Sequence, residues 1–448
     1  MSHSTQNAAS GASNRATTSV STKILLIVSI FSLPIGVLAY LLAANYTPQI
    51  ETARVEISGN AFQRPLMRVV SELMKNKTLI DTCDGQDCEK LRSERRTATR
   101  AAFDEAAKQG TDHAAELKIG DDDLAQKHLA DLSVHSLQKQ WQALDTDGAV
   151  ATAAERGAVS SRYGNLIGQV RQLAGYVGNT STLILDPDLD SYYVVDVTLL
   201  AMPEVTARIE RTSGLASSLV NGGGAPVDRA ALENESKLLD QDLARIAASN
   251  QTSFDADADS HGTSPTLVSS LRPALGRYQS AMNNYRRTLD DSLKEPSVVN
   301  ASALASATNQ ANSASLEYWN VAAGELDQLL QARIGDFQTS RAEALGASGF
   351  VVLLAAFVAF ALGRSITRPL QSLVQNLGPG ATLLASSVER IAETSQSAIP
   401  DPEIAAIICE ELNAHADNMR SAVMELARHV EGSGANRVTP QLAGASKE

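Results

Sequence analysis

The chain has 448 residues and a formal net charge of −13, with 44% hydrophobic but only 4% aromatic residues. Its apolar content is therefore mostly alanine, leucine, valine and isoleucine, which favours helices over aromatic-rich sheets, so we expect an all-α protein. The acidic balance disfavours nucleic acid as a partner, because binding a polyphosphate requires a positive surface.

Two long uncharged runs predict transmembrane helices at residues 23–45 and 342–363. Each is about 20 residues long, which is the length that crosses a ~30 Å hydrocarbon core. The alternative for the first run is a cleaved signal peptide, but the run exceeds the usual length of about 7 to 15 apolar residues, and no clean cleavage site follows it. The alternative for the second run is a buried core helix, which an apolar run of this length disfavours.

The charges beside these runs predict their orientation. Arg15 and Lys23 precede the first run without any acidic residue, and Arg364 and Arg368 follow the second run closely. The positive-inside rule therefore places both termini in the cytoplasm and residues 46–341 on the outer side. The polar tails at residues 1–22 and 433–448 are expected to be disordered.

The cysteines agree with this orientation. Cys83 and Cys88 lie in the segment assigned to an oxidising compartment, whereas Cys409 lies on the reducing side. We predict a disulfide between Cys83 and Cys88. The alternative is a metal clip, but two thiols without a nearby histidine are too few ligands for a structural zinc site.

Apolar residues that recur every three or four positions predict a series of outer helices with short loops. The expected ranges are 52–77, 89–109, 123–144, 150–185, 186–220 with a kink at Pro203, 228–249, 266–293, and a last helix from 301 through the second apolar run. No strand pattern of comparable strength occurs. Residues 46–341 should form either one long bundle or two four-helix bundles stacked away from the membrane, and we favour the stacked form.

A strong helix start is predicted at Asp186, Pro187, Asp188 and Asp190. Asp186 is expected to cap the helix, Pro187 to occupy its first position, and the two later acids to meet the positive end of the helix dipole. The competing interpretation is a calcium loop. It fails because such a loop requires glycine and glutamate where this chain has Ser191 and Val197, so we predict no metal site.

Arg64 and Arg68 lie one helical turn apart and are candidates for binding a carboxylate ligand. The alternative is pairing with acidic side chains of neighbouring helices. Tyr192 is a further candidate for ligand contact, with packing as its alternative. No nucleophile elbow, zinc-protease, phosphate-loop or kinase signature occurs, so we predict neither enzymatic activity nor a cofactor.

Residues 59–70 (GNAFQRPLMRVV) and 183–196 (LILDPDLDSYYVVD) resemble the outer region of bacterial methyl-accepting chemotaxis proteins and related sensor kinases. After the second apolar run, residues 364–377 resemble the first arm of a HAMP domain, with Ile366, Pro369 and Leu370 in the matching places. The resemblance implies a homodimeric sensory receptor of the inner membrane. Such a receptor transmits the binding of a small-molecule or protein ligand in the periplasm.

The cytoplasmic side departs from that pattern. The Asp-Glu-x-Gly element of the second HAMP arm and the Glu-Ala-Ala-Arg-Ala-Gly-Glu hairpin tip are both missing, which puts coupling to the chemotaxis kinase in doubt. We expect a turn at residues 378–380 within a helical segment 378–432, whose apolar stripe at 403–430 requires a helix from a second chain. Glu410 and Glu411 resemble methylation sites, with a solvated helix face as the alternative.

Two other functions compete with the receptor. One is the sensor subunit of a histidine-kinase system, although residues 364–448 leave no room for a phospho-accepting domain and an ATPase. The other is a non-signalling envelope protein that tethers its partners.

Overall fold

The computed structural model describes residues 20–82, 87–150, 152, 155–220, 226–296, 299–395 and 402–431. Throughout these ranges the regular structure is helical, which confirms the all-α expectation. The chain forms two compact units, one of Asn45–Ser340 and one that combines Met1–Ala44 with Arg341–Glu448. The predicted disordered tails lie outside the described residues, except that a helix already begins at Val20.

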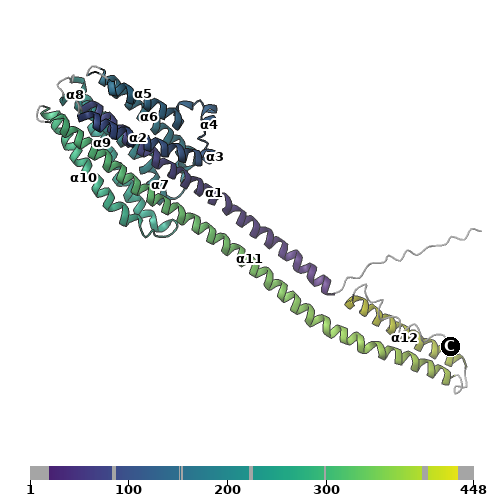
Figure 1. The fold of residues 1–448 in the computed structure, drawn as a ribbon. Coiled ribbons are helices and arrows are strands. Elements are labelled where there is room, and N and C mark those ends of the chain that lie inside the picture. Colours follow the sequence, from purple (N-terminus) through teal and green to yellow (C-terminus); the bar gives the residue numbers. More distant parts are fainter. Residues whose placement is uncertain are drawn as a thin grey trace, which may run out of the picture. The chain divides into compact units, whose positions relative to one another are not determined.

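The helices follow the expected order along the chain, and Figure 1 labels most of them. Their bounds are α1 (Val20–Thr82), α2 (Asp87–Asp112), α3 (Ala114–Leu117), α4 (Asp121–Gln126), η1 (Ala130–Leu132), α5 (Val134–Val150), α6 (Arg156–Thr180), η2 (Leu183–Leu185), α7 (Leu189–Val195), η3 (Asp196–Ala201), α8 (Met202–Val220), α9 (Pro226–Ala256), η4 (Asp257–Asp259), α10 (Leu267–Lys294), α11 (Ala301–Ser395) and α12 (Pro402–Glu431).

The unit of residues 45–340 contains two groups of four long helices. In the first group, of α1, α2, α5 and α6, Phe103 of α2 stacks on Trp141 of α5 with ring centroids 5.6 Å apart. In the second group, of α8, α9, α10 and α11, Tyr278 of α10 stacks on Tyr318 of α11 at 5.1 Å. One continuous cluster of buried apolar side chains runs through both groups.

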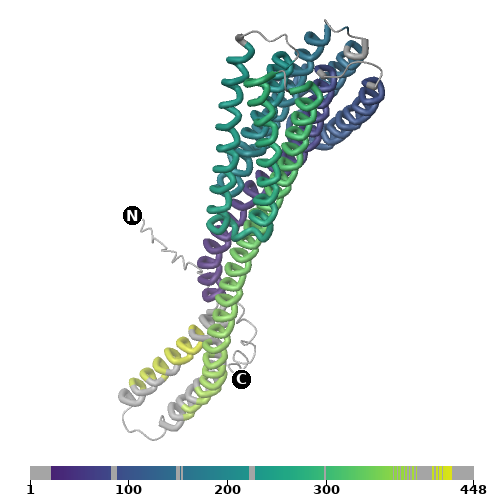
Figure 2. The backbone as a smooth tube through the Cα atoms, turned by 90° about the vertical axis from the view of Figure 1, so that its left-hand side faces the viewer, coloured from purple at the N-terminus to yellow at the C-terminus, as the bar shows by residue number. Residues whose placement is uncertain are grey.

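The two groups lie side by side along their helices, as Figures 1 and 2 show. Both are held by the same stretch of α1: the Gln63 amide donates to the Ala174 carbonyl of α6 at 2.7 Å, and the Asn312 amide of α11 donates to the Ser71 carbonyl at 3.0 Å. Most residues of α1 between 62 and 74 are buried. A helix with so few exposed positions needs neighbours on most of its sides, and here both groups of helices supply them. The expected end-to-end stacking is therefore wrong.

The single helix predicted for residues 123–144 is also wrong. The chain leaves α4 at Gln126, passes through the short η1, and begins α5 only at Val134. His128 has a φ of 59°, in the left-handed region that interrupts a right-handed helix. The apolar residues on both sides of the break keep the three-and-four spacing of a single helix, so the sequence pattern does not show the interruption.

The kink predicted at Pro203 takes the form of a wide π-helical segment, η3, just before the proline. The Met202 N–H bonds to the Val197 carbonyl, and Pro203 has no N–H, so neither residue donates to the carbonyl of Thr198. The indole of Trp319 on α11 donates to that carbonyl instead, at 2.8 Å. The irregular turn thus creates a fixed contact between η3 and α11.

The second unit carries the apolar runs of the sequence. Two helices are long and apolar enough to cross a membrane, and the side chains of their most apolar stretches are almost entirely exposed. Exposed side chains include Leu25, Phe31 and Leu33 of α1 and Phe350, Leu353 and Phe357 of α11. α11 continues as a helix through Pro369 and Pro379, so the turn expected at 378–380 is wrong. A proline inside a helix removes one backbone donor and its ring crowds the carbonyl four residues earlier, but its φ stays near the helical value, and the other turns of this long helix continue on both sides of it.

At Gly59, α1 lies very close to the chain that follows α6. A Cβ atom added there would lie 2.3 Å from Cβ of Ser181 and 3.2 Å from the Leu183 side chain. We predict that Gly59→Ala destabilises the protein by about 1–3 kcal/mol, because Ser181 is buried and cannot move aside. Gly168→Ala in α6 is the control. Its Cβ would meet open space, so it should stabilise the helix by about 0.5–1 kcal/mol. Thermal unfolding of the full-length protein in detergent measures both, and equal effects would contradict this packing.

Candidate functional site

The segment between α6 and α7 folds around the carboxylate of Asp186. Its Oδ1 accepts hydrogen bonds from the backbone N–H of Asp188 at 3.0 Å and from the hydroxyl of Ser191 at 2.9 Å. The helix begins at Leu189, so Asp188 occupies the N-cap position, although its side chain does not bond the helix. The predicted helix start, with Asp186 as the cap and Pro187 as the first helical residue, is thus wrong by two residues. The Asp186 carboxylate is instead bound by a buried arginine.

That arginine is Arg333 of α11. It lies 3.0 Å from Oε2 of Glu56 on α1, 2.6 Å from Oδ1 of Asp186 and 2.5 Å from Oδ2 of Asp188. The Arg333, Glu56 and Asp186 side chains are only 4%, 1% and 0% exposed. We call these four residues, with Ser191 and His261, the Arg333 cluster. It joins four parts of the chain that are far apart in sequence.

His261 closes the cluster on its outer side. One ring nitrogen lies 3.0 Å from Oδ2 of Asp188 and the other lies 3.1 Å from Oδ2 of Asp336 on α11. The ring also packs edge-on against Phe337, with centroids 5.4 Å apart. The loop before α10 is therefore held against both α11 and the start of α7.

The cluster contains more negative than positive groups. Burial, together with the Asp186 carboxylate, raises the pKa of Glu56 to about 7, although Arg333 acts in the opposite direction. Burial also raises the pKa of Asp186, although Arg333 again acts to lower it. Burial alone would lower the pKa of Arg333, but the three carboxylates raise it, so the guanidinium stays charged.

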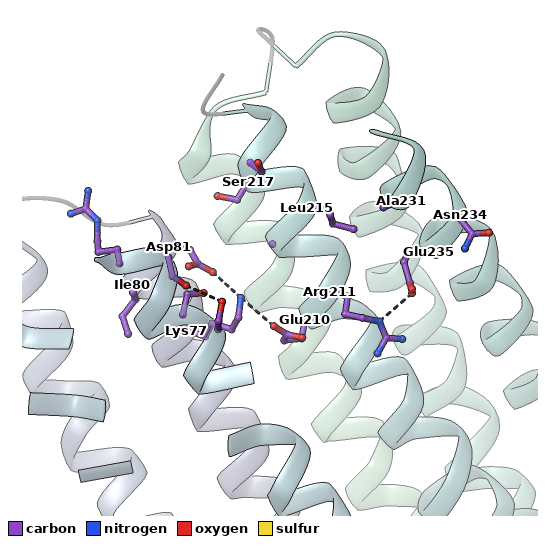
Figure 3. A pocket seen from close by; sticks show the side chains of 16 residues that line it. Lys77, Ile80, Asp81, Glu210, Arg211, Leu215, Ser217, Ala231, Asn234 and Glu235 are labelled. Carbon is purple, nitrogen blue, oxygen red and sulfur yellow. Dashed lines mark hydrogen bonds and ion pairs between the residues drawn. The ribbon is translucent and has the colours of Figure 1, made fainter. Parts of the chain in front are cut away.

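A second feature is a cavity of about 700 Å³ where the end of α1 meets α6, α8 and α9 (Figure 3). Charged groups of both signs line it. Lys77 lies 3.0 Å from Asp81 and 3.2 Å from Glu210, and Arg211 lies 3.3 Å from Glu235. Arg156, Gly214 and four serines also line it, namely Ser160, Ser161, Ser217 and Ser218.

The cations Lys77 and Arg211 of this cavity are held in their charged forms. Burial alone would lower the pKa of Lys77, but Asp81 and Glu210 more than offset this effect and raise it. The same balance raises the pKa of Arg211, with Glu204 and Glu235 as its partners. Such a cavity has the size and polarity to hold a small polar ligand that carries groups of both signs.

The residues predicted to bind a ligand do not line this cavity. Arg64 donates to Asp327 of α11 at 2.6 Å and to the Ala323 carbonyl at 3.0 Å, which is the pairing that we named as its alternative. Arg68 is exposed. Tyr192 is 39% exposed and packs edge-on against Tyr193.

The other predicted positions lie elsewhere. Cys88 is buried and disulfide-bonded, but its predicted partner Cys83 lies outside the described residues, so the pairing stays a prediction. Ile366, Pro369 and Leu370 lie within α11, and Glu410 and Glu411 are exposed on α12. In the part of the chain that the structure describes, no three His, Cys, Asp or Glu residues are grouped so that they could hold a metal ion.

Sequence reasoning missed Glu56 and Arg333, yet a signal for both exists. Ala53, Glu56, Asn60, Gln63 and Met67 are all buried and follow the three-and-four spacing of a helix seam. Arg333 follows Leu326 and Leu330 at the same spacing in α11. A charged residue at a seam position is a sign of a buried ionic contact.

Comparison with known proteins gives no further guide to this site. No family model matches the chain, and neither a curated protein nor a solved structure does.

We predict that Arg333→Met destabilises the protein by about 3–5 kcal/mol, because it leaves buried carboxylates without a cation. Arg64→Met is the matched control on a partly exposed ion pair, with side chains 31% and 23% exposed, and should cost about 1 kcal/mol or less. Denaturation of the full-length protein compares the two variants. A small effect of Arg333→Met would mean that the cluster does not hold α1 and α11 together.

Proposed function

We propose that the protein is a transmembrane sensory receptor of the chemotaxis type, with residues 46–341 outside the bacterial inner membrane and both termini in the cytoplasm. The observation that carries the proposal is that α1 and α11 each combine two features. Each contains an apolar stretch long enough to cross a membrane, and each contributes a buried charged residue to the Arg333 cluster. A change in how these helices pack would therefore pass along two continuous helices.

The contacts between α1 and α11 support a switch between distinct arrangements. Asn60 and Arg64 both bond to the Ala323 carbonyl and the Asp327 carboxylate of α11, at 2.6–3.0 Å. Polar partners of this kind exist only at particular positions along a helix. A shift of one helix along the other therefore requires these bonds to break and to form again in a new register, which favours two discrete states over gradual sliding.

The cavity beside Lys77 and Arg211 is the proposed ligand site. α1, α6, α8 and α9 all contribute to its lining, so a ligand there would contact both groups of helices at once. A ligand shifts the receptor only if it binds one packing more tightly than the other. Closure of α8 and α9 onto α1 around a ligand would supply such a difference.

On the cytoplasmic side, we propose that α12 packs against a partner helix. Ile407 and Met419 of α12 are 59% and 43% exposed, which favours a second copy of the chain as the helix that covers them. A sensor subunit of a histidine-kinase system would use the same outer region.

A ligand screen tests this proposal. Full-length protein in detergent is heated with amino acids, organic acids and sugars, and we expect at least one of them to raise the Tm. Gly214→Leu should weaken that ligand by about tenfold or more, because Gly214 lines the cavity and a leucine side chain would occupy it.

Gly276→Leu in α10 is the matched control, since it places the same side chain in open space outside the cavity. It should leave the Tm shift by the ligand unchanged. If none of the compounds raises the Tm, the result favours the non-signalling tether. If both variants weaken the ligand equally, the cavity is not its site.

A further inference from the structure

The Arg333 cluster has an unsatisfied acceptor and an excess of acid. Three carboxylates, from Glu56, Asp186 and Asp188, surround one guanidinium. Oδ2 of Asp186 is buried and has no hydrogen-bond partner among the described residues. A buried carboxylate oxygen without a donor costs free energy, and a second negative charge beside it increases that cost.

A single proton would relieve both problems. A protonated Glu56 is neutral, which removes one of the negative charges, and it carries an O–H group that can donate a hydrogen bond. The cluster contains one acceptor that lacks a donor, on Asp186. Asp186 accepts hydrogen bonds from the Asp188 N–H, the Ser191 hydroxyl and Arg333, which favour its ionised form. Of the other two carboxyl groups, Glu56 is the one suited to hold the proton, because its side chain is 1% exposed whereas that of Asp188 is 23% exposed.

We propose that the Arg333 cluster is a proton-binding site, and that the proton it holds sets the packing of α1 against α11 and the segment before α7. The protein would then respond to the acidity of the surrounding medium. Only this consequence rests on the receptor proposed above, since proton binding by the cluster follows from its own geometry.

The charged groups that face Glu56 come from two other parts of the chain. The segment before α7 contributes Asp186 and Asp188, and α11 contributes Arg333, while the nearby Thr182 hydroxyl acts to lower the pKa of Glu56. His261 lies one contact further out, against Asp188, and Asp336 lies beyond it, against His261.

Two more acids lie beyond these groups. Asp190 follows in α7, where its Oδ1 accepts the Ser191 N–H at 2.7 Å. Burial and the nearby Asp190 raise the pKa of Asp257 in η4, whereas the hydrogen bond from the Ser264 N–H acts to lower it. The surroundings of Glu56 are therefore mostly negative, with Arg333 as the cation in direct contact.

The sign of the pH effect follows from Glu56. Its pKa is about 7 in the folded protein against 4.5 for the free side chain, so the folded state holds the proton more tightly than the unfolded state. This stabilisation is complete below the unfolded pKa of 4.5 and is lost as the pH rises through about 7. Asp186 shifts in the same direction and adds to the effect.

The test measures the Tm of the full-length protein in detergent from about pH 5 to about pH 8. We expect the Tm of the native sequence to fall by on the order of 5 °C across this range. Glu56→Gln is permanently neutral and keeps an amide donor, so it should remove this fall. Glu72→Gln, at another buried glutamate of α1 that pairs with Lys75, should keep it. A flat native profile, or a fall retained in Glu56→Gln, would overturn the proposal.

Hydrogen exchange tests the link to packing, and it also serves if Glu56→Gln folds poorly. After correction for the intrinsic pH dependence of exchange, residues 53–63 and 323–333 of the native protein should be more protected at about pH 5 than at about pH 8. Equal protection at both values would overturn the link between the proton and the packing of α1 against α11. Neither measurement involves the cavity ligand or the membrane, so failure here leaves the receptor proposal standing, and failure of the ligand screen leaves this one standing.

Discussion

A guanidinium buried among three carboxylates is the constraint on which the rest of the structure depends. Removing these charges from water is costly, and only a fixed geometry with several hydrogen bonds recovers that cost. Arg333 meets the requirement because its planar fork reaches Glu56 and Asp186 through separate nitrogens. The cluster therefore selects one register of α1, the segment before α7, and α11, even where its net contribution to stability is small.

The same logic extends along α1. Asn60, Gln63 and Lys77 interrupt its apolar seam, and each finds a partner on a different helix, α11, α6 and α8 respectively. Apolar side chains alone would permit several registers of similar free energy, whereas these polar contacts permit few. The molecule thus combines a continuous apolar core with a row of specific bonds. That combination suits a bundle that changes between defined packings.

Helix content and order could be predicted from the sequence, because long amphipathic helices impose a clear period of three and four. The side-by-side arrangement could not, since the same stripe on α1 would serve an end-to-end bundle equally well. The DPDLDS motif was recognised as special, but its acids were assigned to capping because Arg333 lies 147 residues away and nothing local reveals it. The cavity was missed for a similar reason: Lys77 and Arg211 lie on different helices and meet only in the folded chain.

Membrane topology is the central claim, and a single protease experiment tests it most directly. A cleavage sequence is inserted after Lys127, which is exposed in the turn between α4 and η1, and an epitope tag is placed at each terminus. In intact spheroplasts, added protease should cut at residue 127 while both tags stay protected until the membrane is opened. Protection of residue 127 in intact spheroplasts, with cutting only after lysis, would contradict the account.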